Sequence, residues 1–521
     1  MYGPIEVLGS AILLHNYTLG DNEYLERKLS IWNKTIHGFQ PLAYFYDKEN
    51  KILYVPKGIE FYYIVNSLVR NQIINQPPDP FDNIGEVRLK YPPRDERQLE
   101  ALKFCCGIEP YTKNRGMSQL SLNLVTGFGK SFLACFTWAF YSIKTIMITA
   151  GADWLKQWKQ RLIEYSDVRE DEIYIISGSP SIYKLLNGVI DHQKIRFYLC
   201  THSTIYSYGN KKGWNAVREL FKFLKIGIKI YDEAHLYFEN ILKIDMFTNT
   251  FKTLYLTATP KRSSFYQNRI YQSCFSTVPK IELFDEDLDV HTSYLSICFN
   301  SHPNAYDIEN CHNRQYGFNT VAYVDYFIRT NVYFKLLTIV LNHCLLNLNK
   351  DEKILIYIGT NAAILETYYW LRYYYNNISV GIYTSIIDKK VKREQLENTI
   401  ILSTSKSAGV LLDIPKLKFT VIFAEVFHSE VIARQILGRT RDKNTTLIEL
   451  VDVGFEKLRD WYRYKVNTVY SKYATEVSEL AYNQADINQA LINIAKQAEE
   501  QRESNKHLLK TVVEKVDINK E

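Results

Sequence analysis

A glycine-rich turn that closes on a lysine and a hydroxyl is the first feature of this sequence that could do chemistry. Residues 123–131 read Asn-Leu-Val-Thr-Gly-Phe-Gly-Lys-Ser. The two glycines allow backbone N–H groups to face phosphate oxygens, and a following helix N-terminus favours negative charge there. Lys130 can pair with terminal phosphates and the Ser131 hydroxyl can bind Mg²⁺. The candidate phosphate-binding residues are Thr126, Gly127, Phe128, Gly129, Lys130 and Ser131.

Two adjacent carboxylates supply the second half of the same chemistry. Asp232 and Glu233 follow the apolar run Ile226–Tyr231. Asp232 is placed to hold a hydrated Mg²⁺, and Glu233 to orient and deprotonate an attacking water. Such acids can also serve as helix N-caps, but beside a phosphate-binding turn they favour hydrolysis of ATP with Mg²⁺. We expect their strand to lie beside the strand that precedes the glycine-rich turn.

Strand-like and helical runs alternate in two long stretches, from Ile84 to about Val278 and from about Tyr323 to Val453. This alternation predicts an α/β fold with parallel sheets flanked by helices. The expected strands are Leu120–Val125, Thr145–Thr149, Ile173–Ile176, Arg196–Cys200, Ile226–Tyr231, Thr253–Leu256, Lys353–Ile358, Val380–Tyr383, Thr399–Ser403, Thr420–Phe423 and Thr446–Val451.

The chain has 521 residues, which is too long for one ordinary core. Short apolar runs before the proline cluster Pro77–Pro80 predict a small accessory domain. The stretch after Trp461 is poor in strand signals and predicts a helical tail. We therefore expect four parts: an accessory domain at 1–84, an ATP-binding lobe at 85–285, a second lobe at 320–460 and the tail at 461–521.

Composition limits the class of protein. With 46% hydrophobic and 23% charged residues the chain is globular, and no run of eighteen apolar residues predicts a membrane span. The eight cysteines are scattered except for Cys105–Cys106, which favours reduced thiols over a zinc site. The net charge of +6 allows nucleic-acid binding without requiring it. We expect a cytoplasmic location, with the nucleus as an open alternative.

The two site motifs and a third and fourth segment together resemble superfamily 2 helicases. Asp232–His235 (Asp-Glu-Ala-His), Leu256–Pro260 (Leu-Thr-Ala-Thr-Pro) and Gln435–Arg441 resemble motifs II, III and VI. Weaker matches are Gln98–Ala101 to the adenine-reading segment, Leu155–Trp158 to motif Ia, Thr201–Ser203 to motif Ib and Ser403–Pro415 to motif V. The resemblance covers roughly residues 90–455 and implies two tandem RecA-like lobes in a nucleic-acid-dependent ATPase.

The resemblance also implies roles within the ATP site. Gln98 would read adenine, and His235 would couple the ATP site to motifs III and VI. Arg439 would contact the γ-phosphate from the second lobe and stabilise the transition state. ATP would draw Lys130 and Asp232 of the first lobe toward Arg439 and Gln435 of the second. Arg441 is displaced by one residue from the usual second arginine, so it is either the arginine finger or a surface residue.

Nucleic acid is the implied partner. Thr201 and Thr404 match positions that hold the phosphate backbone, which carries no sequence information. Trp158 is either a stacking platform or a packing residue behind motif Ia. Thr-Ala-Thr-Pro and Gln157-Trp158 resemble the DNA-translocating branch that includes phage UvsW and a poxvirus transcript-release helicase.

That branch implies 3′-to-5′ movement on DNA, with strand separation or remodelling in viral-type replication or transcription. Transcription or replication proteins are possible partners, and no membrane partner is expected. An RNA helicase is one alternative, since no motif reads the 2′-OH. A non-unwinding ATPase that acts in transcription termination or remodelling is the other.

Overall fold

The structure is a computed structural model with two compact units, Met1–Asp285 and Glu286–Glu521. The residues that it describes are 3–20, 22–33, 37–60, 63–64, 72–124, 128–257, 265–283, 292–313, 317–388, 391–408, 414–437 and 445–503.

The first unit begins with a small mixed sheet. Within its described residues the strand order is β5-β6-β2-β1-β7, antiparallel except for the parallel pair β1–β7. Helix α1 and the hairpin β3–β4 are inserted between β2 and β5. The bounds are β1 (Ile5–Val7), β2 (Ala11–Leu14), α1 (Glu23–Leu29), β3 (Ser30–Asn33), β4 (Gly38–Pro41), β5 (Phe45–Asp47), β6 (Ile52–Pro56) and β7 (Ile73–Asn75).

A parallel sheet of seven strands follows in the described part of this unit, in the order β10-β11-β9-β12-β13-β8-β14. The strands are β8 (Gln119–Leu124), β9 (Thr145–Thr149), β10 (Ile173–Ile176), β11 (Phe197–Thr201), β12 (Ile228–Asp232), β13 (Lys252–Thr257) and β14 (Lys280–Leu283). The helices are α2 (Glu96–Cys106), α3 (Lys130–Tyr141), α4 (Asp153–Tyr165), α5 (Gly178–Leu186), α6 (His202–Lys212), α7 (Trp214–Phe223), α8 (Phe238–Met246) and α9 (Phe265–Cys274). Short 3₁₀ turns lie at Thr112–Gly116 and Glu170–Glu172.

The strand order corrects one expectation. The strand that ends on Asp232 was expected beside the strand that precedes the glycine-rich turn, and this is wrong: β13 lies between β12 and β8 and pairs with both. Hydrophobic periodicity shows where strands lie, but the crossover connections set their order. The intervening strand places Thr257 between the acidic pair and the phosphate-binding turn.

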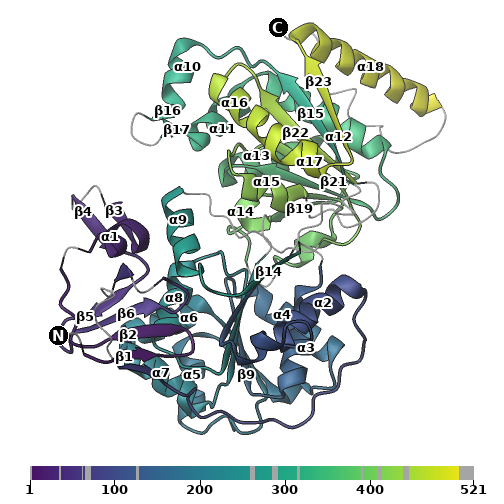
Figure 1. The fold of residues 1–521 in the computed structure, drawn as a ribbon. Coiled ribbons are helices and arrows are strands. Elements are labelled where there is room, and N and C mark those ends of the chain that lie inside the picture. Colours follow the sequence, from purple (N-terminus) through teal and green to yellow (C-terminus); the bar gives the residue numbers. More distant parts are fainter. Residues whose placement is uncertain are drawn as a thin grey trace. The chain divides into compact units, whose positions relative to one another are not determined.

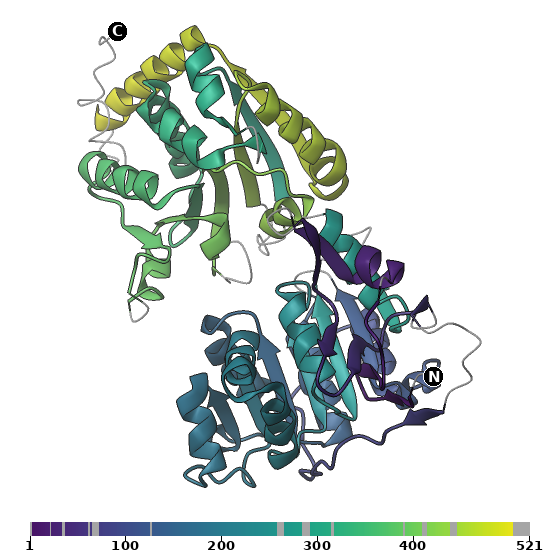
Figure 2. The ribbon, with the colours of Figure 1, turned by 90° about the vertical axis from the view of Figure 1, so that its left-hand side faces the viewer.

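The small N-terminal sheet packs against the helices of this lobe. Figures 1 and 2 show its strands in purple beside α8, and β2 and β6 contact that helix. Helix α1 contacts α9. Leu13, Leu53 and Val55 share one buried core with Phe238 and Leu242 of α8. The accessory domain and the first lobe therefore share a hydrophobic core.

The second unit holds another parallel sheet, whose seven strands among the described residues run β19-β20-β18-β21-β22-β15-β23. The strands are β15 (Thr292–Phe299), β18 (Lys353–Ile358), β19 (Val380–Tyr383), β20 (Ile400–Ser403), β21 (Leu417–Ala424), β22 (Thr445–Asp452) and β23 (Glu476–Tyr482), with a small hairpin β16 (His312–Asn313) and β17 (Gly317–Phe318). The helices are α10 (Ala305–Asn310), α11 (Thr320–Arg329), α12 (Val332–Leu346), α13 (Asn361–Tyr374), α14 (Ser405–Ala408), α15 (Glu430–Leu437), α16 (Glu456–Lys465), α17 (Ser471–Tyr473) and α18 (Gln484–Glu503). A 3₁₀ turn lies at Glu394–Glu397 and a π-helix at Val466–Tyr470.

Two parallel sheets with flanking helices confirm the expected α/β fold with tandem lobes. The tail is helical as expected over α16, α17 and α18, and the structure adds one strand to it. Strand β23 pairs in parallel with β15 at the edge of the second sheet, and α18 packs against α12 (Figure 1). The boundaries expected for the four domains stay predictions. No helix in the described ranges is long and apolar enough to cross a membrane.

Candidate functional site

The phosphate-binding turn leads from the buried strand β8 into helix α3, which begins at Lys130. Gly129 caps this helix with φ of 95°, a left-handed conformation that favours glycine. A Cβ atom at Gly129 would lie 2.5 Å from Nε2 of Gln98, so a side chain there would collide with this amide. Ser131 lies in the first turn of α3. Thr126 and Gly127 lie outside the described residues.

Gln98 is buried against the turn from helix α2. Asp95 caps this helix by accepting a hydrogen bond from the Gln98 N–H at 2.7 Å. The Gln98 Oε1 accepts from the backbone N–H of Arg94 (2.7 Å), and its Nε2 donates to the backbone carbonyl of Phe128 (3.3 Å). The Phe128 ring is buried in the core of the lobe, so only its backbone is available to a phosphate. Gln98 is thus fixed directly on the phosphate-binding turn.

Lys130 and the acidic pair meet in the same buried place. The Lys130 Nζ lies 2.7 Å from Oε1 of Glu233, with side-chain exposures of 11% and 2%. Glu233 has φ of 49°, so the backbone leaves the extended conformation as soon as β12 ends at Asp232. Lys130 of the phosphate-binding turn and Glu233 of the acidic pair are therefore in contact.

The two carboxylates differ in their proton affinity. Burial raises the pKa of Asp232 above its ordinary value, and the charge of Glu233 adds to the rise. Burial would also raise the pKa of Glu233, but Lys130 and His235 hold it below its ordinary value. The indole N–H of Trp158 donates to Oδ2 of Asp232 at 2.8 Å. Trp158 is 4% exposed, which agrees with the packing interpretation and leaves no ring face for stacking on a base.

His235 connects the acidic motif to the next strand. Its Nδ1 lies 2.8 Å from Oγ1 of Thr257 and 3.2 Å from Oε2 of Glu233. The backbone N–H of Ala234 donates to the carbonyl of Leu256 at 2.9 Å. The segments that resemble motifs II and III are thus joined by a side-chain and a backbone contact. Residues 258–260 of the third motif lie outside the described residues.

The candidate nucleic-acid threonine of the first lobe has a local structural role. Thr201 is the N-cap of α6, is 6% exposed, and its Oγ1 accepts from the N–H of Thr204 at 3.2 Å. The next residue, His202, lies 3.0 Å from Nδ2 of Asn240, and its ring is 4.7 Å from that of Tyr237. Sequence reasoning did not identify this contact, which links the motif Ib region to the segment after the acidic motif.

In the second unit the candidate motif V begins at the end of β20. The Thr404 Oγ1 accepts from the N–H of Ser407 at 3.1 Å and holds the start of α14. The backbone N–H and the hydroxyl of Ser405 both donate to the carboxylate of Glu425, which follows β21. Glu425 is a second residue that the sequence did not suggest, since nothing in its local pattern marks it.

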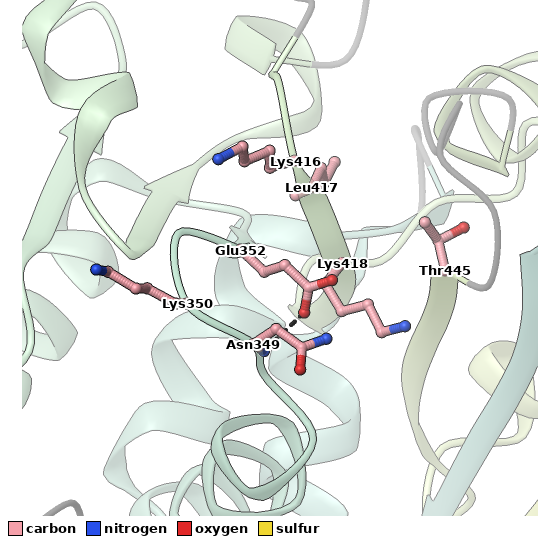
Figure 3. A pocket seen from close by; sticks show the side chains of 7 residues that line it. All are labelled: Asn349, Lys350, Glu352, Lys416, Leu417, Lys418 and Thr445. Atoms are coloured by element: carbon pink, nitrogen blue, oxygen red, sulfur yellow. Dashed lines mark hydrogen bonds between the residues drawn. The ribbon is translucent and has the colours of Figure 1, made fainter.

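Only part of the candidate motif VI lies among the described residues. Gln435 lies on α15, but its side chain is outside the described part, and so are Arg439 and Arg441. Thr445, the first described residue after them, lines a hollow of about 340 Å³ at the start of β18, β21 and β22 (Figure 3). The other lining residues are Asn349, Lys350, Glu352, Lys416, Leu417 and Lys418. None of the predicted site residues lines it, and we assign it no role.

The oxygen donors of the first lobe suit magnesium. Asp232 supplies a carboxylate and Ser131 a hydroxyl, both of which Mg²⁺ prefers. No group of three His, Cys, Asp or Glu side chains that could hold a metal occurs among the residues that the structure describes. Mg²⁺ commonly takes one or two carboxylates and completes its shell with substrate phosphates and water. A Mg²⁺ brought by a nucleotide fits these residues.

Comparison with known families agrees with the site. Residues 92–262 match the family model described as "Type III restriction enzyme, res subunit". The matched segment contains Gln98, the phosphate-binding turn, the acidic motif and the third motif. The match supports the expected superfamily 2 motor in this part of the chain, which is about a third of its length. A comparison with curated proteins gave no match.

Several solved structures resemble the chain at low identity. Dbp5 of S. cerevisiae bound to RNA and ADP BeF3 is 12% identical, with 73% of this chain and 88% of that chain covered and a TM-score of 0.47. T4 UvsW is 14% identical, with 92% and 99% covered and a TM-score of 0.33. The Hef helicase domain of Pyrococcus furiosus is 11% identical, with 71% and 97% covered and a TM-score of 0.43. At such identities and scores these likenesses carry no functional conclusion.

Proposed function

We propose that this chain is an ATP-hydrolysing superfamily 2 helicase that moves along DNA in the 3′-to-5′ direction and uses ATP hydrolysis to separate strands or displace bound complexes. Two features support DNA over RNA. The Thr-Ala-Thr-Pro and Gln-Trp segments resemble the DNA-translocating branch, and the matched family model is named for a restriction-enzyme subunit.

The observation that carries the proposal is a series of buried polar contacts, in which Lys130 contacts Glu233, Glu233 contacts His235, and His235 contacts Thr257. Lys130 would leave Glu233 to bind the β- and γ-phosphates, and Glu233 would then be free to orient and deprotonate the attacking water. Asp232 and Ser131 would hold the Mg²⁺ that ATP brings, which neutralises charge on the phosphates. Because His235 contacts both Glu233 and Thr257, a movement of Glu233 on nucleotide binding would shift His235 and, through it, Thr257.

The remaining predicted roles complete the cycle. Gln98 would read adenine, and Gln435, Arg439 and Arg441 would contribute from the second lobe, with an arginine stabilising the charge on the transferred phosphoryl group. Nucleotide-driven closure of two lobes and their reopening would produce movement. Thr201 and Thr404 would lie near the phosphate backbone, with their hydroxyls exchanging local partners for phosphate oxygens.

The test is the ATPase rate of the full chain with single-stranded DNA, duplex DNA and RNA at one fixed salt concentration, because affinity depends steeply on salt. The Lys130→Ala variant supplies the background. We expect DNA to stimulate hydrolysis at least about tenfold above that background. Stimulation by RNA alone would overturn the DNA assignment, and no stimulation by any nucleic acid would overturn the proposal.

Polarity requires a second assay. On a single strand that carries a biotin–streptavidin block at one end, a 3′-to-5′ motor should displace the block from the 5′ end and not from the 3′ end. Displacement from the 3′ end alone contradicts the proposed polarity. ATPase stimulation with block displacement but without duplex separation supports the remodelling activity over strand separation.

A further inference from the structure

Helix α4 contacts three elements that carry site motifs. It packs against α3, the helix that starts at Lys130, and against β11, the strand that ends at Thr201. Its residues Leu155–Trp158 are the segment that resembles motif Ia. Through Trp158 it also bonds to Asp232 at the end of β12. One helix therefore touches the phosphate-binding helix, the candidate nucleic-acid strand and the acidic motif.

The bond between Trp158 and Asp232 is well placed to orient the carboxylate. The donor and acceptor are 74 residues apart in sequence, and the Nε1–Oδ2 distance is 2.8 Å. The two residues are 4% and 7% exposed, so water competes little for either atom. An indole N–H has no acceptor function and only one hydrogen to give. A hydrogen bond to an ionised acceptor is shorter and stronger than one between neutral groups, and it fixes the direction of the carboxylate.

We propose that Trp158 is a positioning residue that orients Asp232 for Mg²⁺-bound nucleotide and links motif Ia on α4 to the ATP site. The inference rests on the proposed function, since it takes Asp232 as the magnesium ligand. The sequence suggested either a stacking role or a packing role for Trp158. The proposed role differs from both, because the indole ring packs in the core while its N–H orients the Asp232 carboxylate. A residue that orients a metal ligand from behind commonly changes metal affinity 10- to 100-fold when it is lost.

Trp158→Phe separates the two functions of the side chain, because phenylalanine keeps an aromatic ring in the core and lacks the N–H. Trp154→Phe is the matched control on the same helix: the Trp154 ring packs partly buried against Gly151 and the same core. Both variants should keep the circular dichroism spectrum and the thermal midpoint within a few degrees of the unchanged chain.

The decisive measurement is equilibrium binding of a fluorescent ATP analogue to the full chain, with and without Mg²⁺. Trp158→Phe should weaken the Mg²⁺-dependent part of binding about tenfold or more and leave metal-free binding unchanged. Trp154→Phe should change neither. A second measurement is the ratio of ATPase rates with and without single-stranded DNA, which should fall in Trp158→Phe and stay the same in Trp154→Phe.

The possible failures are distinguishable. If the unchanged chain shows no Mg²⁺-dependent nucleotide binding, the proposed function and this inference both fail. If it shows such binding and Trp158→Phe behaves like Trp154→Phe, the inference alone is wrong. A loss of metal-free and Mg²⁺-dependent binding in equal measure would show that Trp158 acts only by packing, which also overturns it.

If Trp158→Phe does not fold, hydrogen exchange of indole N–H groups in the otherwise unchanged chain replaces it. Trp158 should belong to the slowly exchanging indoles, unlike Trp32, which is 52% exposed. In an Asp232→Ala variant, one slow indole should exchange at least tenfold faster because its acceptor is gone. Unaltered exchange of every slow indole overturns the proposed bond.

Discussion

Replacing Asp245 with asparagine should strongly destabilise the first unit. The Asp245 carboxylate is 1% exposed and accepts from Lys229 Nζ at 2.5 Å, from the Tyr231 hydroxyl at 2.8 Å and from the Tyr255 hydroxyl at 2.5 Å. Lys229 is fully buried. The network lies under β12 and β13, and Tyr231 directly precedes Asp232. A change at Asp245 therefore leaves a buried ammonium without its counter-charge, close to the ATP site.

The size of the stability loss expected for Asp245→Asn follows from the burial of the ion pair. Removing one partner of a buried ion pair costs about 3–5 kcal/mol, because the remaining charge stays desolvated. Burial lowers the pKa of Lys229, so the lysine in the variant can lose its proton, which limits the cost. Asparagine also keeps one acceptor oxygen. We expect Asp245→Asn to cost about 3 kcal/mol, at the lower end of the range.

A double variant tests whether the loss of stability comes from the unpaired charge of Lys229. In Lys229→Met with Asp245→Leu both charges are gone, and an apolar pair can replace a buried ion pair at little cost. The double variant should therefore be more stable than the sum of the single variants predicts, with an interaction energy of about 2–3 kcal/mol.

Hydrogen exchange measured by mass spectrometry on peptides from residues 228–246 is the assay, because it reports local opening without requiring a two-state transition of a two-unit chain. Glu219→Gln is the control. It breaks the exposed Lys222–Glu219 pair (3.0 Å) on α7 and should cost less than about 1 kcal/mol. If Asp245→Asn costs no more than this control, or if the two charge removals are additive, the account of the network is wrong.

Four further predictions concern the site. Lys130→Ala should lower nucleic-acid-stimulated ATPase at least about 100-fold, measured against unchanged chain in steady-state assays. Gln98→Ala should raise the KM for ATP several-fold more than the KM for GTP, since only adenine is read by this side chain. Thr257→Val removes one partner of His235, a bond worth about 0.5–1.5 kcal/mol, so strand displacement should fall more than ATPase in parallel assays. Burial lowers the pKa of His202 to about 4, so between about pH 6.5 and pH 4 the unfolded chain takes up a proton that the folded chain does not. The free energy of unfolding should therefore decline on acidification across this window, by at most about 3 kcal/mol. Denaturation curves of His202→Phe should show a smaller decline over the same window.

Much of the fold could be predicted because buried parallel strands are short apolar runs with clear ends. The expected strands Thr145–Thr149, Ile173–Ile176, Lys353–Ile358 and Val380–Tyr383 have the bounds of β9, β10, β18 and β19. Strands β9, β18 and β19 are buried along their whole length and β10 at its two ends, so apolar side chains run almost continuously in each. Lys130 and Glu233 lie at the same edge of the sheet for a related reason, since both residues follow carboxyl ends of parallel strands.

The features that the sequence did not predict depend on long-range pairing. Strand β23 is exposed along most of its length, its apolar residues Val477 and Leu480 included, so its stability comes from pairing with β15, more than 180 residues earlier. The position of β13 between β12 and β8 depends on crossovers that periodicity does not encode. The bond from Trp158 to Asp232 had no signal at all, because an apolar helix position looks the same whether or not its ring carries a useful N–H.

The N-terminal sheet is joined to the first lobe by polar and backbone contacts as well as by a shared core. Its Ser10 Oγ accepts from buried Lys229, and the N–H of Gly9 donates to Oδ1 of Asn249. A Cβ atom at Gly58 would lie 2.2 Å from the carbonyl of Cys274 at the end of α9, so the backbones touch. These contacts reach β12, the segment after α8, and α9, and the Ser10 hydroxyl also donates to the Asp245 carbonyl of α8. Because groups that share a buried core and a buried charge network open together, a movement of any of these elements must be accommodated by the N-terminal sheet.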